Sequence, residues 1–133
     1  MAAWACACED RKTRHRMARL STHVLDTARG MPAKGVKIEL HRVHGARRAH
    51  VTTMVTNAGG RTDAPIISGE RLETGVYELI FHAGDYLRGS GATLSEPPFL
   101  DLVVVRFGIA EPEGSYHVPL LLSPYGYSTY RGS

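Results

Sequence analysis

Two histidines and one arginine are the side chains best suited to acid–base and anion chemistry in this 133-residue chain. His23 lies in the run LSTHVLD and His117 in the run YHVPLLL, both rich in apolar residues and without a charge beside the histidine. Imidazole titrates near neutral pH, so it can take up a proton and return it. Arg61 directly follows the turn NAGG, and its guanidinium offers a planar set of donors to carbonyl or oxyanion groups. Each residue taken alone is more typical of packing or of a surface turn than of catalysis.

The other histidines and the two cysteines do not form a recognisable metal-ligand set. His41 and His44 belong to the Arg-rich stretch HRVHGARRAH, which we interpret as a solvated strand end and loop. Cys6 and Cys8 form a single C-x-C pair, which lacks the four ligands of a structural zinc site. The chain also has no phosphate-binding glycine loop and no GxSxG motif. We therefore expect neither a metal ion nor an organic cofactor.

Charge and hydrophobicity exclude two classes of protein. Residues 1–19 carry five of the 16 Lys and Arg but only two of the 13 Asp and Glu, so residues 20–133 are formally neutral. A nucleic-acid-binding domain concentrates basic charge on its folded surface, so we expect no nucleic-acid partner. No apolar run approaches the ~20 residues that span a bilayer. We expect residues 1–18 to form a poorly ordered extension without a signal-peptide pattern, residues 19–133 to form the domain, and the protein to be cytoplasmic.

The elements that must position His23, Arg61 and His117 are short strands separated by turns. Val36, Ile38 and Leu40 alternate with polar residues, which is the period of a half-buried strand. Similar patterns predict strands over residues 20–26, 51–56, 75–82, 100–108, 116–122 and 125–131, and one short helix over 85–90. Pro119 has no N–H to donate, so its strand should be an edge, be bulged, or pair on one side only. The pattern favours an all-β fold, an antiparallel β-sandwich.

Three segments together resemble a known enzyme family. LSTHVLDT near the start, TNAGGRTD in the middle and YHVPLLLSPYGYSTYRGS at the end are similar to the 5-hydroxyisourate hydrolases, the transthyretin-related enzymes of urate breakdown. The resemblance covers residues 19–133, and the terminal YRGS is its most specific part. Gly59 departs from the family pattern, which usually has Asp in TNADGR. The substitution removes a side chain that would stiffen the turn before Arg61.

The resemblance implies a prealbumin-like, or transthyretin-like, sandwich that assembles as a homotetramer, a dimer of dimers, with active sites along the channel between dimers. It implies a catalytic set of His23, Arg61, His117 and Ser133, and a substrate-binding set of His23, Arg61, Tyr130 and Arg131. The implied reaction is the hydrolytic ring opening of 5-hydroxyisourate to 2-oxo-4-hydroxy-4-carboxy-5-ureidoimidazoline.

Hydrolysis of a cyclic amide requires a base for water, donors for the oxyanion and groups that orient the flat ring. We expect His23 and His117 to share the water and the proton path, with either one as the base, and Arg61 to hold the oxyanion. Two other classes stay open at this point. One is a non-catalytic carrier of a small aromatic ligand, of the transthyretin type, and the other is an immunoglobulin-like interaction module.

Overall fold

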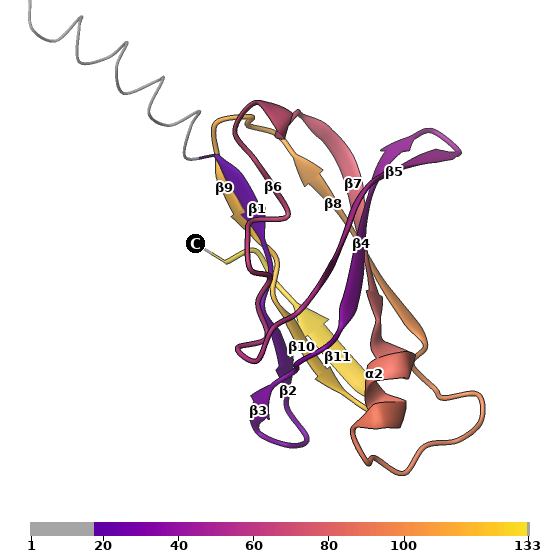
Figure 1. Ribbon diagram of the computed structural model, residues 1–133. Helices are drawn as coiled ribbons and strands as arrows, with labels where there is room; N and C mark the ends of the chain where they lie inside the picture. Colours follow the sequence, from indigo (N-terminus) through magenta and orange to yellow (C-terminus); the bar gives the residue numbers. More distant parts are fainter. Residues whose placement is uncertain (1–17, 133) are drawn as a thin grey trace, which may run out of the picture.

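The computed structural model describes residues 18–132, which fold into short strands, one 3-10 turn and one helix (Figure 1). In chain order the elements are β1 (Arg19–Ser21), β2 (Val24–Asp26), β3 (Met31–Pro32), β4 (Lys37–His44), β5 (Arg47–Val55), β6 (Ile67–Ser68), η1 (Gly69–Arg71), β7 (Gly75–His82), α2 (Ala83–Gly89), β8 (Leu102–Ile109), β9 (Ser115–His117), β10 (Leu120–Ser123) and β11 (Gly126–Thr129). The extension expected over residues 1–18 lies outside the described residues except for Ala18, which is buried.

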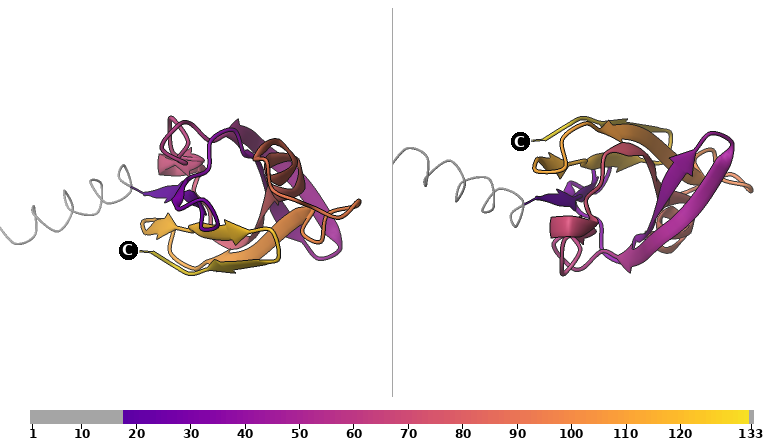
Figure 2. Two further views of the ribbon diagram at one scale, coloured as in Figure 1. Left: turned by 90° about the horizontal axis from the view of Figure 1, so that it is seen from below. Right: turned by 90° about the horizontal axis from the view of Figure 1, so that it is seen from above.

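The strands form two layers that enclose one hydrophobic core (Figures 1 and 2). One layer is the antiparallel sheet β5-β4-β7-β8. The other consists of two smaller sheets, β6-β1-β9 and β11-β10-β2-β3. The alternation on β7 turns Tyr77, Leu79 and Phe81 inward, where each is almost fully buried. The predicted all-β sandwich with one short helix is therefore confirmed.

The two smaller sheets are joined by a continuous parallel register. Ser21 pairs with His117 on one side of the junction, and Val24 pairs with Leu120 on the other. Backbone bonds bridge the gap, because Val118 N donates to Ser21 O and Leu120 N donates to His23 O. Both segments leave regular strand at the same level, after Ser21 and after His117, where the Thr22 hydroxyl donates to the Val118 carbonyl at 2.7 Å.

This junction corrects two predictions. The strands predicted over residues 20–26 and 116–122 are each divided in two, and His23 lies between β1 and β2 instead of in the middle of a strand. The sandwich is also not purely antiparallel, since β1 with β9 and β2 with β10 run parallel. The N–H groups of Val118 and Leu120, on either side of Pro119, still donate across the junction, so the two segments stay in one layer there.

A third correction concerns the Arg-rich stretch with His41 and His44. It continues β4 and β5 as a hairpin, and is not a loop. The reversal occurs at Gly45, whose φ of +61° is accessible to glycine at low cost. The predicted helix over residues 85–90 is present as α2, displaced two residues toward the amino terminus at its start.

Candidate functional site

His117 is the last residue of β9 and faces Ser21 across the parallel pair with β1. The Ser21 hydroxyl lies 2.9 Å from Nδ1 of His117. Two residues farther along, the carbonyl of His23 accepts from Leu120 N, so both histidines are attached to the same stretch of paired backbone. The pairing register of these two segments therefore brings together imidazoles that are 94 residues apart in the sequence.

Arg61 is brought to the histidines by a turn that the Asn57 side chain organises. Asn57 Oδ1 accepts from Gly59 N at 2.9 Å and from Arg61 N at 3.3 Å. The backbone of the turn closes with Asn57 N donating to Arg61 O, and Val24 N donates to Gly60 O. The stiffening side chain that Gly59 lacks is thus supplied by Asn57, a role that the sequence interpretation missed.

A glycine lies against each imidazole ring. A Cβ on Gly60 would come within 3.2 Å of His23 Cδ2, and a Cβ on Gly132 would come within 2.7 Å of His117 Cδ2. Gly60 also has a φ of +74°, and an added Cβ would overlap the Val24 carbonyl oxygen. Close approach of backbone to ring therefore requires glycine at both positions.

The surroundings of the two imidazoles favour their neutral forms. Burial lowers the pKa of His23, and the nearby Arg61 charge lowers it further, whereas a hydrogen bond from the ring to the Gly59 carbonyl opposes the change. Burial also lowers the pKa of His117, with added contributions from Arg61, His23 and Arg19. Both rings are therefore poised as neutral groups that can exchange a proton at neutral pH.

A small hollow opens beside this cluster, between β1 and the chain that follows Arg61. Its volume is about 200 Å³. Two cationic side chains border it, and its lining consists of Arg19, Ser21, Thr22, Arg61, Thr62, Asp63, Ala64 and Pro65. A guanidinium pair at such a hollow suits a planar ligand with carbonyl oxygens or negative charge.

The carboxy-terminal tail reaches His117 through its backbone. Gly132 N donates to His117 O at 2.7 Å. Arg131 turns away from the cluster, because its guanidinium lies over the Tyr116 ring, 4.2 Å from the centroid. Tyr130 is 60% exposed and, with Arg131, lines a different hollow of about 280 Å³ beside β8 and Tyr116.

Of the predicted site residues, His23, Arg61 and His117 thus lie close together. Tyr130 and Arg131 do not join them within this chain, and Ser133 lies outside the described residues. The sequence interpretation missed Ser21 and Arg19, which border the same hollow. Its position two residues before His23 was the only sequence signal for Ser21. Its pairing with His117 can be recognised only once the register of β1 and β9 is known.

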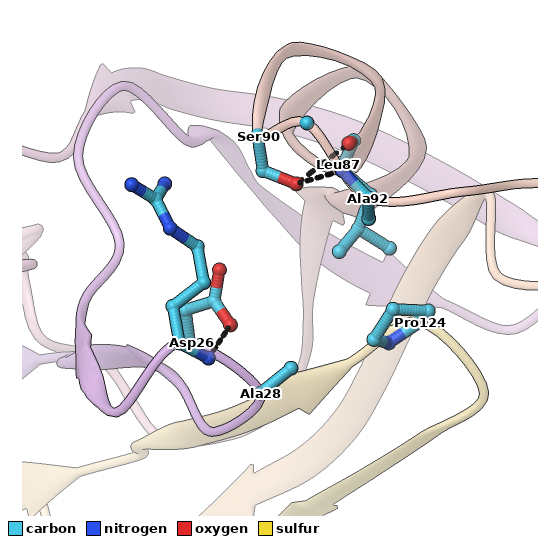
Figure 3. Close-up of a pocket in the computed structure, with 8 residues that line it drawn as sticks. Asp26, Ala28, Leu87, Ser90, Ala92 and Pro124 are labelled. Carbon is cyan, nitrogen blue, oxygen red and sulfur yellow. Dashed lines mark hydrogen bonds between the residues drawn. The ribbon is translucent and has the colours of Figure 1, made fainter.

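Another hollow of about 200 Å³, between the β2–β3 turn and α2, contains none of the predicted residues (Figure 3). Both oxygens of its buried carboxylate, Asp26, already accept hydrogen bonds within the protein. One accepts from Arg29 N at 3.0 Å and the other from the Tyr86 hydroxyl at 2.7 Å. Ser90 Oγ donates to the Leu87 carbonyl at the end of the helix. The bond from the Tyr86 hydroxyl to Asp26 fastens the turn to the helix.

Within residues 18–132, no three His, Cys, Asp or Glu side chains are placed to hold a metal ion. No helix in the same part of the chain is long and apolar enough to cross a membrane. The C-x-C pair, Cys6 and Cys8, lies outside the described residues.

Comparison with known proteins gives consistent results. The sequence model of the HIUase/Transthyretin family matches residues 20–132. The chain is 60% identical over 115 residues to 5-hydroxyisourate hydrolase 2 of Rhizobium meliloti, covering 86% of this chain and 96% of that protein. The structure of Klebsiella pneumoniae 5-hydroxyisourate hydrolase is similar with a TM-score of 0.73 and 36% identity, covering 88% of this chain and all of that one. Transthyretin from Sparus aurata is similar with a TM-score of 0.76 and 29% identity, covering 86% of this chain and 97% of that one. The chain belongs to the HIUase/Transthyretin family.

Proposed function

We propose that this protein is a hydrolase that opens the ring of 5-hydroxyisourate in urate degradation. The observation that carries the proposal is the meeting of two imidazoles of lowered pKa with one guanidinium at a single junction of the fold. The 60% identity to a 5-hydroxyisourate hydrolase along nearly its whole length supports the same reaction.

The reaction adds water to an activated ring carbonyl and then expels a ring nitrogen. A neutral imidazole takes the proton from water as the new C–O bond forms, and the same proton goes to the nitrogen when the C–N bond breaks. Arg61 holds the oxyanion, a contribution that commonly corresponds to ~10²–10³ in rate for one such donor. Burial favours the unprotonated form of both His23 and His117, so a neutral imidazole is present to take this proton.

The tail completes the site in this proposal. The backbone bond from Gly132 N to His117 O holds Gly132 beside the imidazole, and Ser133 is the next residue in the sequence. Arg131 fastens the tail by lying over the Tyr116 ring instead of binding substrate from within its own chain. Deleting residues 131–133 should leave the sandwich folded, as measured by circular dichroism, and should reduce turnover steeply. Near-normal turnover of the shortened chain would remove the tail from the mechanism.

We further propose that the hydrolase works as a homotetramer with the site between dimers. The outer strands β8 and β11 support assembly, because within residues 18–132 each leaves one edge unpaired and carries exposed apolar side chains. Leu102 is 52% exposed, Val104 43% and Tyr127 46%. Native mass spectrometry should detect four copies, and dissociation by dilution should abolish turnover. A monomer with full turnover would contradict the shared site.

A carrier of an aromatic ligand is less consistent with the same observations. A binding channel needs no pair of proton-exchanging imidazoles beside a guanidinium, and identity to the Sparus aurata transthyretin is only 29%. The direct test adds purified protein to freshly generated 5-hydroxyisourate and follows the ultraviolet absorbance. A hydrolase makes the absorbance decay faster than the spontaneous reaction, in proportion to protein concentration. A decay rate independent of protein would reject the proposed function.

A further inference from the structure

The hydrogen bond between Ser21 and His117 defines how the imidazole is oriented. The two residues are register partners on β1 and β9, and Ser21 Oγ lies 2.9 Å from Nδ1 of His117. A serine hydroxyl carries one proton and needs an acceptor for it. Within residues 18–132, Nδ1 is the only hydrogen-bond partner of this hydroxyl, and no partner is found there for the other ring nitrogen, Nε2.

A neutral imidazole carries its single proton on one of its two nitrogens. When the Ser21 hydroxyl donates to Nδ1, that nitrogen is the acceptor and the proton must be on Nε2. The His117 ring then presents an N–H, and not a lone pair, on its side away from Ser21. A neutral imidazole N–H is an effective hydrogen-bond donor to a carbonyl that gains negative charge.

His23 is held by a group of the opposite kind. The backbone carbonyl of Gly59, which can only accept, lies beside the His23 ring and raises the pKa of the imidazole. The nitrogen facing Gly59 therefore keeps the proton, and the other nitrogen has a free lone pair when the ring is neutral. The two imidazoles are thus anchored in ways that expose different functional atoms.

We propose that Ser21 is a positioning residue that holds His117 as the neutral tautomer protonated on Nε2, so that His117 donates to the substrate carbonyl oxygen while His23 is the base. This inference rests on the proposed function. In the reaction, water forms the C–O bond and gives its proton to His23, which passes that proton to the leaving ring nitrogen as the C–N bond breaks. His117 and Arg61 stabilise the oxyanion throughout, and neither gains or loses a proton.

The tautomer can be measured without any turnover. Nitrogen-15 NMR of histidine-labelled protein, at a pH where His117 is neutral, distinguishes a protonated Nε2 from a protonated Nδ1. Wild type should show the proton of His117 on Nε2, and Ser21→Ala should shift the ring toward a mixture of both tautomers. A wild-type proton on Nδ1, or an unchanged tautomer in Ser21→Ala, would overturn the proposal even if the protein hydrolyses 5-hydroxyisourate.

Steady-state kinetics are the second test of the role of Ser21. Ser21→Ala should lower kcat by about 10- to 100-fold, less than the ~10²–10³ expected for removal of an oxyanion donor itself, and should leave KM within about threefold. Ser21→Thr keeps the hydroxyl and should restore most of kcat. Ser115→Ala, which removes an exposed hydroxyl two residues before His117, is the matched control and should behave as wild type. Equal kcat for Ser21→Ala and Ser115→Ala would contradict the role of Ser21, whereas an inactive wild type would reject the proposed function and leave the NMR test valid.

Discussion

Gly132→Ala should damage catalysis through a single added methyl group. The new Cβ would lie 2.7 Å from Cδ2 of His117 and 3.3 Å from its Cβ and Cγ. Carbon atoms in ordinary contact are about 3.5–4.0 Å apart, so the ring or the tail must move by roughly 1 Å. The backbone itself does not resist the change, because Gly132 is not among the glycines with positive φ.

Either movement separates groups that must meet in the reaction. A shift of the ring strains its 2.9 Å bond to Ser21, and a shift of the tail breaks the 2.7 Å bond from Gly132 N to His117 O. A displacement of about 1 Å in an active site can cost ~10²-fold in rate, and we expect kcat to fall by about that factor. The melting temperature should change little, since Gly132 lies beyond the last named strand.

The assay compares kcat for 5-hydroxyisourate with thermal unfolding followed by circular dichroism. Gly89→Ala is the matched control, because nothing lies within 4 Å of the added Cβ at the end of α2. It should retain wild-type turnover. A Gly132→Ala protein that keeps its fold and turns over within twofold of wild type would refute the argument that the tail backbone fixes the position of His117.

Three further predictions concern the guanidinium, the imidazoles and the turn held to α2. Arg61→Ala should reduce kcat by ~10²–10³-fold, and Arg61→Lys should recover only part of it because an ammonium lacks the planar fork of donors; full recovery with lysine would exclude planar recognition. Because the pKa values of His23 and His117 are both lowered and only their neutral forms act, kcat/KM should fall to half of its plateau at a pH below 6.5, the ordinary value for histidine; a midpoint at or above 6.5 would contradict the lowered values. Tyr86→Phe removes the 2.7 Å hydrogen bond to the buried Asp26 carboxylate and should lower the free energy of unfolding by about 1–3 kcal/mol in urea titrations, with kcat retained; unchanged stability would show that water or another donor replaces the phenol.

The sequence predicts the two-layer fold well because alternation is a local signal. Val36, Ile38 and Leu40 are all buried, as their spacing indicates. The parallel pairing of β1 with β9 is not a local signal, since it joins residues 96 positions apart. Pro119 lies at the interruption, but the N–H groups that bridge it belong to Val118 and Leu120.

The sequence predicts the ionisable residues of the site well, but it predicts the residues that position them much less well. His23, Arg61 and His117 stand out by type and by family resemblance, and the fold brings them together. Ser21, Asn57 and Gly132 act through neighbours that only the folded chain defines, and isolated serines, asparagines and glycines are common on any surface. Tyr130 and Arg131 are assigned to substrate by resemblance alone, and their position beside Tyr116 in this chain is set by a stacking contact that sequence patterns do not reveal.

The most direct test of a single catalytic site is a double-mutant cycle on turnover of 5-hydroxyisourate with His23→Ala, Arg61→Ala and the combined variant. Groups that act together on one reacting carbonyl give losses that do not multiply. If both residues serve one site, the double variant should be about as slow as the slower single variant. Losses that multiply fully, or single variants that both retain wild-type kcat, would show that these two residues do not serve the same site.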